Sequence, residues 1–240
     1  MQDDSTQLWL APPGAAARLE PARLHAADRA RWRALRGPAR RGEWEASRAL
    51  LTALALPRGC ATSLSHSGGF AAMAVVSAGH RVGVDLQRIG QRDVLRLAQF
   101  AFSPAEVRQI AALPEEPARE HFHVLWVLKE AFGKALGLPL TQALRECCFV
   151  KRDMGWQARV PAEDAWQAVV LAPRAELVLA AVVLGQRRKG NRVWSCGEWP
   201  GSPTAEWPQL ARFRSQLVTA CRTRSRSPAS CPRSRLAPGH

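Results

Sequence analysis

The stretch HFHVLWVLKEAFGKALGLPL, residues 121–140, decides how the rest of the chain is organised. No Pro or Gly precedes Gly133 in it, so the pattern predicts a helix that runs for about three turns before it loosens. Trp126, Glu130 and Lys134 recur at four-residue spacing, which places their side chains on one helix face. Glu130 and Lys134 could form an ordinary surface ion pair, or this face could belong to a functional site. The polar residues upstream favour the second interpretation.

The positive charge of the chain is concentrated near its end. The chain has 240 residues, enough for one domain or two small halves, and a formal net charge of +14. Residues 185–240 contain 11 of the 34 Lys and Arg but only two acids, Glu198 and Glu206. This segment is rich in Pro and has little periodicity, which predicts a basic and largely disordered tail. Such a tail could bind RNA or an acidic partner, so a polyanion-binding protein is one candidate class.

The remaining composition indicates a cytoplasmic protein. There is no run of roughly 18 apolar residues, and the N-terminal MQDDSTQLWL is acidic, so neither a membrane span nor a signal peptide is expected. The six cysteines show no CxxC pair and no zinc spacing, and we expect reduced thiols.

Hydrophobic periodicity indicates helices followed by strands, twice along the chain. The first group is an extended opening at 8–10, helices at 18–36 and 43–56, and strands at 62–65, 71–77 and 81–86. The second group is helices at 93–100, 103–114 and from 117 onward, then strands at 147–152, 157–160, 165–172 and 176–184. The helix at 103 has a capping box, with Ser103 as N-cap and Glu106 three residues later. This order predicts a duplicated α+β unit with halves at residues 1–83 and 84–184.

The strand containing GVDLQ, residues 83–87, carries two side-chain oxygens on one face. Alternation places Asp85 and Gln87 together, while Val84 and Leu86 point into the core. With Glu130 from the helix, these groups suit a hard divalent cation such as Mg²⁺. Asp85 could instead cap the turn at residues 88–90.

His66 lies in the segment SHSGG, among small hydroxyl and glycine residues. There the backbone can approach a ligand closely and the imidazole can donate to an anionic oxygen, which indicates a phosphate contact. A turn histidine without a ligand is the alternative. No GxSxG motif is present, so a serine nucleophile is not expected.

Four segments in order resemble the motif set of the Sfp-type 4'-phosphopantetheinyl transferases. They are SLSHSGG (63–69), GVDLQRI (83–89), AFSPAE (101–106) and FHVLWVLKEAFGKALG (122–137). The resemblance extends over about residues 29–184, and its strongest part is the pairing of GVD with WxxKEAxxKALG. It implies an α+β fold with pseudo-two-fold duplication of a helix-plus-antiparallel-strand unit. It also implies magnesium-dependent transfer of 4'-phosphopantetheine from coenzyme A to a serine of an apo carrier protein, releasing adenosine 3',5'-bisphosphate.

The resemblance also implies roles at the metal and the reacting phosphates. Asp85 and Glu130 would hold Mg²⁺, and Gln87 stands where many members have a second acid, so the metal site has one charge fewer. Lys134 would bind the pyrophosphate of coenzyme A, and Lys129 beside it would assist.

Further residues are implied in proton transfer and nucleotide binding. Glu106, the acid of the FSxxE motif, is with Glu130 a candidate to accept the proton of the attacking serine, which makes Glu130, Lys134 and Glu106 the catalytic set. His66 would contact a phosphate. The basic stretch that includes Arg36 and Arg41 occupies the region from which family members reach the 3'-phosphate. The segment 57–62 is short and lacks the GKP-like sequence that often cradles the adenine side.

The expected partner is an acidic carrier protein of a fatty-acid, polyketide or nonribosomal-peptide system, which the modestly basic body would attract. A duplicated chain makes a monomer sufficient. Nucleic acid is not the expected partner, because the Trp residues are too scattered for a stacking platform. Two alternatives stay open: a polyanion- or RNA-binding basic protein, and a degenerate transferase kept as a scaffold.

Overall fold

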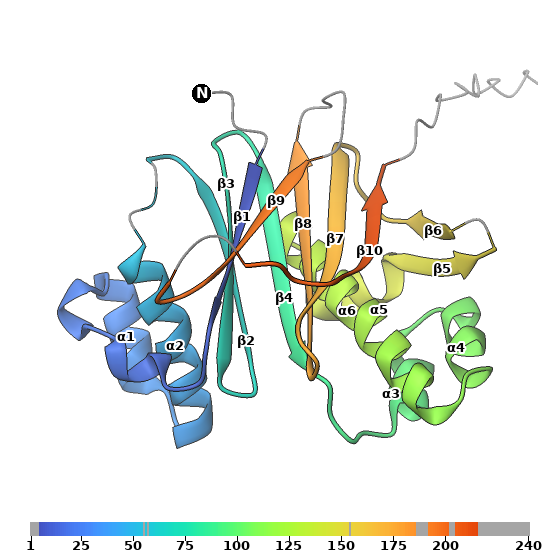
Figure 1. The fold of residues 1–240 in the computed structure, drawn as a ribbon, viewed down its shortest axis with the longest axis horizontal. Helices are drawn as coiled ribbons and strands as arrows, with labels where there is room; N and C mark the ends of the chain where they lie inside the picture. Colours follow the sequence, from blue (N-terminus) through green and yellow to red (C-terminus); the bar gives the residue numbers. More distant parts are fainter. Residues whose placement is uncertain are drawn as a thin grey trace, which may run out of the picture.

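A computed structural model describes residues 5–54, 56, 58–153, 155–185, 192–201 and 205–215 of the chain. Within them, two four-stranded sheets lie against each other, and helices cover the outer side of each (Figure 1). The molecule is therefore layered as helices, sheet, sheet, helices. In the part of the chain that is described, no helix is both long and apolar enough to cross a membrane.

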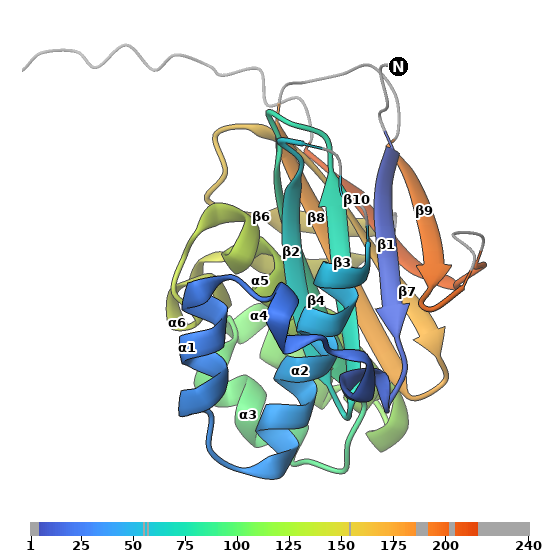
Figure 2. The ribbon, with the colours of Figure 1, turned by 90° about the vertical axis from the view of Figure 1, so that its left-hand side faces the viewer.

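The first half contains three strands and two α-helices. Its order is β1 (Ser5–Ala11), the 3-10 turns η1 (Ala15–Arg18) and η2 (Pro21–Arg23), α1 (Ala26–Ala34), α2 (Pro38–Ala53), β2 (Ala61–Ser67) and β3 (Phe70–Val76). The strands join a sheet with the order β2-β3-β1-β9, where β9 is Val193–Glu198. Figure 2 shows α2 in front of the lower part of this sheet, with α1 to its left.

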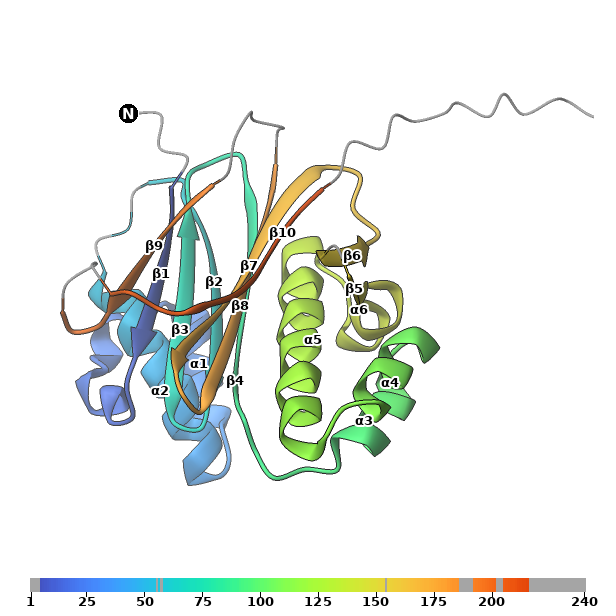
Figure 3. The same ribbon diagram turned by 45° about the vertical axis from the view of Figure 1, so that its right-hand side comes forward.

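The second half repeats this plan with additional helices. It contains β4 (Arg81–Arg88), α3 (Val94–Ala101), α4 (Pro104–Ala111), α5 (Glu115–Leu136), α6 (Leu140–Glu146), β5 (Cys148–Arg152), β6 (Gly155–Arg159), β7 (Ala165–Arg174) and β8 (Leu177–Gly185). Its sheet has the order β10-β7-β8-β4, where β10 is Gln209–Arg214. Helix α5 lies alongside this sheet (Figure 3).

The two sheets share one connectivity. In each half a strand is followed by helices and then by two antiparallel strands, and the last strand inserts between the other two. Thus β1, β2 and β3 correspond to β4, β7 and β8. The predicted duplicated α+β unit is confirmed.

Three apolar clusters hold the layers together. One lies between the two sheets, a second between α3–α6 and the outer face of the second sheet, and a third between α2 and the outer face of the first. Residues that contact across the sheets include Leu8, Ala74, Val84, Leu86 and Leu179, all fully buried. Because β4 is thus covered on both faces, a polar side chain on it must find a partner inside the protein.

The prediction that the basic segment is disordered is wrong for residues 192–201 and 205–215. Strand β9 pairs in parallel with β1, and β10 pairs antiparallel with β7. Glu198 in β9 accepts two hydrogen bonds from the guanidinium of Arg174, at 2.5 and 2.7 Å. These segments therefore extend the two sheets, one in each half. The remainder of the predicted tail, residues 186–191, 202–204 and 216–240, lies outside the described residues.

Other boundaries differ from the prediction for local reasons. The limit at residues 83 and 84 falls inside β4, which belongs entirely to the second sheet. The predicted helix 18–36 is broken, because Pro21 begins a separate 3-10 turn. Helix α2 begins at Pro38 rather than at 43, since Pro is favoured at the first helical position. The capping box of Ser103 and Glu106 is confirmed.

Candidate active site

The two halves meet at an edge where serine side chains replace backbone pairing. The hydroxyls of Ser63, Ser65 and Ser67 on β2 accept hydrogen bonds from backbone N–H groups of β4, at 3.0, 3.1 and 3.0 Å. Their donors are Val84, Leu86 and Arg88, so alternate residues of the two strands are matched. Since the bridging group is a side chain, the strands stand further apart than in a sheet, and polar groups can occupy this seam.

Helix α5 approaches the seam unusually closely at Gly83. A Cβ at this position would lie 2.0 Å from the carbonyl oxygen of Ala131 and 2.7 Å from the backbone nitrogen of Ala135. Only glycine permits this approach. The glycine of the GVD motif therefore has a packing role, which places α5 residues 130 and 134 next to Asp85.

Asp85 is the buried acid of the site, with 1% of its surface exposed. Its Oδ1 accepts hydrogen bonds from the Ser65 hydroxyl and the Lys134 ammonium, both at 2.8 Å. Its Oδ2 accepts one from the Gln87 amide at 3.2 Å. The carboxylate thus points into the seam, as the alternation along β4 predicts, and takes its hydrogen bonds there rather than from the turn at residues 88–90.

Glu130 lies beside Asp85, and both carboxyl groups are near the Lys134 ammonium. Burial raises the pKa of Glu130 to about 7, the nearby Asp85 carboxylate adds to the rise, and Lys134 acts against it. The Trp126 indole donates to Glu130 Oε1 at 2.6 Å, which fixes the carboxyl group. With both acids ionised, one ammonium faces two carboxylates, so the site carries excess negative charge.

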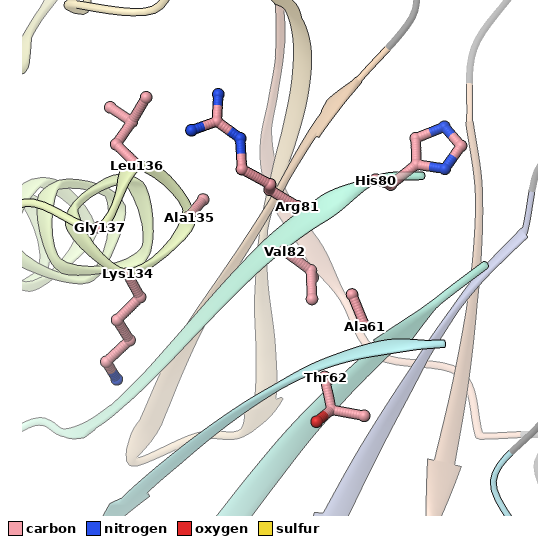
Figure 4. A pocket seen from close by; sticks show the side chains of 9 residues that line it. All are labelled: Ala61, Thr62, His80, Arg81, Val82, Lys134, Ala135, Leu136 and Gly137. Carbon is pink, nitrogen blue, oxygen red and sulfur yellow. The ribbon is translucent and has the colours of Figure 1, made fainter. Parts of the chain in front are cut away.

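Lys134 connects the acid pair to open space. Its Nζ donates to Asp85 Oδ1 and to the Val84 carbonyl oxygen, each at 2.8 Å, and its side chain is 33% exposed. It also lines a cleft of about 350 Å³ between the end of α5 and the starts of β2 and β4 (Figure 4). Lys134 therefore contributes a positive charge to the lining of this cleft.

Glu106 and Lys129 lie away from the acid pair and bind each other. Both side chains are completely buried, and Lys129 Nζ is 2.9 Å from Glu106 Oε2. Glu106 also accepts from the backbone N–H groups of Ser103 and Phe149, at 2.9 Å each. Lys129 donates in addition to the carbonyl oxygens of Leu144 and Cys147. The structure therefore does not bring either residue to the seam.

The predicted nucleotide contacts are dispersed. His66 is near the end of β2, where its Nδ1 is 3.2 Å from Glu43 Oε2. Arg41 lies over the Trp32 ring, 5.0 Å from its centroid, and its Nε is 3.3 Å from Glu45 Oε1. Arg36 is exposed between α1 and α2. His66 lines a cavity of about 620 Å³ near this end of β2.

Sequence reasoning missed Ser65 as a partner of Asp85. The signal was present in the alternation of Ser63, Ser65 and Ser67, which places three hydroxyls on one side of a strand. What could not be seen is that this side faces another strand of the chain.

The side chains at the seam can be compared with the ligands that a metal ion requires. In the described part of the chain, no three or more His, Cys, Asp or Glu residues are grouped to hold an ion. Two carboxylates and the Gln87 amide oxygen are nevertheless the donor types that a hard cation prefers. The raised pKa of Glu130 means that a second positive charge here would be stabilised. The residues present therefore fit Mg²⁺ with few protein ligands.

Comparisons with known proteins match the segment that contains Asp85, Glu130 and Lys134. Residues 81–181 match the family model described as the 4'-phosphopantetheinyl transferase superfamily. Within this segment the chain is similar to that superfamily, which supports the predicted family.

Individual relatives cover a limited part of the chain. The 4'-phosphopantetheinyl transferase of Bacillus subtilis is 33% identical over 82 residues, which are 32% of this chain and 35% of the relative. The transferase psf-1 of Bacillus pumilus is 37% identical over 82 residues, 34% of each chain. The chain thus matches about a third of the length of these relatives. A holo-(acyl-carrier-protein) synthase from Bacillus anthracis, solved with CoA, aligns at 19% identity and a TM-score of 0.38, over 45% of this chain and 96% of that one.

Proposed function

We propose that the chain transfers 4'-phosphopantetheine from coenzyme A to a serine of an apo carrier protein, with release of adenosine 3',5'-bisphosphate. One observation carries this proposal: Asp85, Glu130 and Lys134 converge at the seam, and all three lie in the segment that matches the superfamily. Phosphoryl transfer requires a protein mainly to position the groups and to neutralise charge. A site of two acids and one ammonium beside a cleft supports that chemistry.

Lys134 is the proposed ligand of the pyrophosphate. It is anchored by Asp85 and the Val84 carbonyl, so its ammonium is held at the cleft without a search among rotamers. There it can offset the negative charge that develops on the leaving bisphosphate. The attacking serine belongs to the carrier, and the chain itself needs no nucleophile.

Asp85, Glu130 and Gln87 are the proposed ligands of Mg²⁺. When bound, the ion would supply positive charge to the bridging phosphate oxygens. The chain's own contribution is to hold the two carboxylates side by side, through the Ser65 hydroxyl on one and the Trp126 indole on the other. Since Gln87 is neutral, we expect a weaker metal site than one with three acids.

Glu130 is the proposed acceptor of the serine proton. Its carboxyl group lies beside Asp85 and Lys134 at the seam, where the attacking serine would meet the pyrophosphate. Glu106 was the other candidate, but its carboxylate is enclosed by Ser103, Lys129 and the Phe149 amide. We therefore assign Glu106 and Lys129 to holding α4, α5 and β5 together.

We expect the reaction in the cytoplasm, with a monomeric enzyme and an acidic carrier. The polyanion-binding alternative rested on the basic tail and on the arginines of residues 18–48, and β9 and β10 take part of that tail into the sheets. No described feature favours it over the transferase.

The full chain can be tested by incubation with coenzyme A, Mg²⁺ and a panel of apo carriers from fatty-acid, polyketide and nonribosomal-peptide systems. Mass spectrometry is expected to find phosphopantetheine on at least one carrier. A carrier whose modified serine is replaced by alanine serves as the control. If no carrier gains the group, the proposal is wrong.

A further inference from the structure

The three serines of the seam do not make the same contacts. The hydroxyls of Ser63, Ser65 and Ser67 each accept a hydrogen bond from a backbone N–H group of β4, at 3.0, 3.1 and 3.0 Å. As far as the described residues extend, only the Ser65 hydroxyl also donates to a carboxylate, that of Asp85, at 2.8 Å. Ser65 is therefore the serine that joins the seam to the acid pair.

The direction of both Ser65 hydrogen bonds follows from the chemistry of its partners. A backbone N–H can only donate, so the Ser65 oxygen accepts from Leu86. A carboxylate can only accept, so the single hydroxyl proton goes to Asp85. Ser65 is 6% exposed and Asp85 1%, so water has little access to this bond. The amide, the hydroxyl and the carboxylate form a chain in which each bond polarises the next.

The Ser65 contact also distinguishes the two oxygens of Asp85. Oδ1 accepts from the Ser65 hydroxyl and from the Lys134 ammonium, both at 2.8 Å. Oδ2 accepts a longer bond from the Gln87 amide, at 3.2 Å. Oδ1 is thus taken up by two strong donors, and Oδ2, on the side of Gln87, is the oxygen that can bind a further positive charge.

The hydroxyl and the carboxylate that it holds come from different halves of the molecule. Ser65 lies on β2, which belongs to the first sheet, whereas Asp85 lies on β4, which belongs to the second. The other two proposed metal ligands, Gln87 and Glu130, are on β4 and α5. The first half therefore supplies no proposed ligand but holds one of the acids in place.

We propose that Ser65 is a positioning residue for Asp85, so that the affinity of the site for a divalent cation depends on the contact between the two halves. The hydroxyl turns Oδ2 toward the cation by keeping Oδ1 at the seam. Groups that hydrogen-bond a metal ligand fix its orientation, and removing one typically costs about tenfold to a hundredfold in metal affinity or activity. This inference rests on the proposed function, from which the metal site is taken.

Cation binding in the absence of coenzyme A and carrier tests the proposal. Calorimetry on the full chain gives a dissociation constant for Mn²⁺, used as the probe in place of Mg²⁺. We expect Ser65→Ala to weaken Mn²⁺ binding about tenfold. Ser65→Thr keeps a hydroxyl on the same strand and should restore most of the affinity.

The matched control is Ser63→Ala, which removes the acceptor of the Val84 N–H from the same strand but no contact with a carboxylate. Each alanine variant leaves one backbone N–H of β4 without its hydroxyl partner, so both should unfold at lower denaturant concentration. Only Ser65→Ala should also lose cation affinity. Circular dichroism checks the fold of every variant. If Ser65→Ala does not fold, Ser65→Cys, which has a similar size and a weaker donor, takes its place and should weaken binding in the same direction.

Each result decides the matter. If Ser65→Ala binds Mn²⁺ as tightly as the wild type, if Ser63→Ala loses as much affinity, or if the wild-type chain binds no cation, the assignment is overturned. A chain that shows the Ser65 effect but modifies no carrier keeps the positioning role and loses the proposed function. A chain that modifies a carrier while Ser65→Ala binds Mn²⁺ as the wild type does keeps the function and loses the positioning role.

Discussion

Helix α5 carries two lysines, each paired with an acid, and the two pairs behave differently. Lys129 and Glu106 are 2.9 Å apart, and both side chains have 0% exposure. Lys134 and Asp85 are 2.8 Å apart, with side chains 33% and 2% exposed. Similar distances thus occur in a sealed core and at an open cleft.

The difference lies in whether the charges balance. In the enclosed pair, one ammonium meets one carboxylate, and neighbouring backbone groups fill the remaining hydrogen-bond positions. At the seam, one ammonium meets two carboxylates, and the pKa of Glu130 is raised as a result of burial and of Asp85. A balanced buried pair fixes elements to each other, whereas an unbalanced one can bind a further charge.

The largest effect is expected from removing a charge at the seam. Glu130→Gln should lower kcat/KM for carrier modification by about 10⁴-fold or more, equal to about 5.5 kcal/mol, because Glu130 is both a proposed metal ligand and the proposed proton acceptor. The measurement is phosphopantetheine transfer under saturating Mg²⁺. Glu120→Gln, on an exposed position of the same helix, should transfer at the wild-type rate. Near-wild-type turnover of Glu130→Gln would mean that the metal assignment is wrong.

The enclosed pair should respond in stability instead. Glu106→Gln leaves the Lys129 ammonium buried without a counter-charge, and we expect the free energy of unfolding to fall by about 3–4 kcal/mol. Denaturant titration measures it.

Changing both partners sharpens this result. Glu106→Gln combined with Lys129→Met removes both charges and should recover part of the lost stability. If the double variant is no more stable than Glu106→Gln alone, the pair does not act through its charges.

The same change at Glu130 should stabilise the fold. Its folded pKa, about 7, is above the ordinary value of 4.5, so ionised Glu130 disfavours the folded state, and the penalty grows as pH rises from 4.5 to 7. Glu130→Gln cannot ionise, and we expect a gain of about 1–2 kcal/mol above pH 7. Below pH 4.5 the variant and the wild type should have equal stability. A gain in stability that does not depend on pH would contradict its assignment to the ionisation of Glu130.

The smallest effect concerns Gln87. Gln87→Glu adds a third acid beside Asp85, and we expect the apparent affinity for Mg²⁺ to rise about threefold to tenfold. The dependence of transfer on Mg²⁺ concentration gives this value. Gln99→Glu, on an exposed position of α3, is the control and should leave it unchanged. An unaltered affinity in Gln87→Glu would place residue 87 outside the metal site.

Much of the fold could be predicted because its patterns are local. The strands at 165–172 and 176–184 correspond to β7 and β8 with shifts of one or two residues. Helix α6 was missed because its short segment has weak periodicity. Strands β9 and β10 were missed because composition favoured disorder, while pairing with β1 and β7 supplies stability that composition does not record.

The candidate site was predicted in part. The structure brings together Asp85, Gln87, Glu130 and Lys134. Alternation along a strand and four-residue spacing along a helix predicted correctly which of these side chains share a face. Glu106 and Lys129 bind each other away from the seam, and we assign them to holding α4, α5 and β5 together. The roles of Arg36 and Arg41 stay predictions from the family resemblance.

The sequence by itself determined which residues share a face: Asp85 with Gln87 on a strand, and Trp126 with Glu130 on a helix. It could do so because the periods of strands and helices depend only on neighbouring residues. Only the tertiary structure decided that Lys129 is sealed and Lys134 is open. Their partners lie 23 and 49 residues away, and the close approach of α5 to β4 at Gly83 places Lys134 beside Asp85.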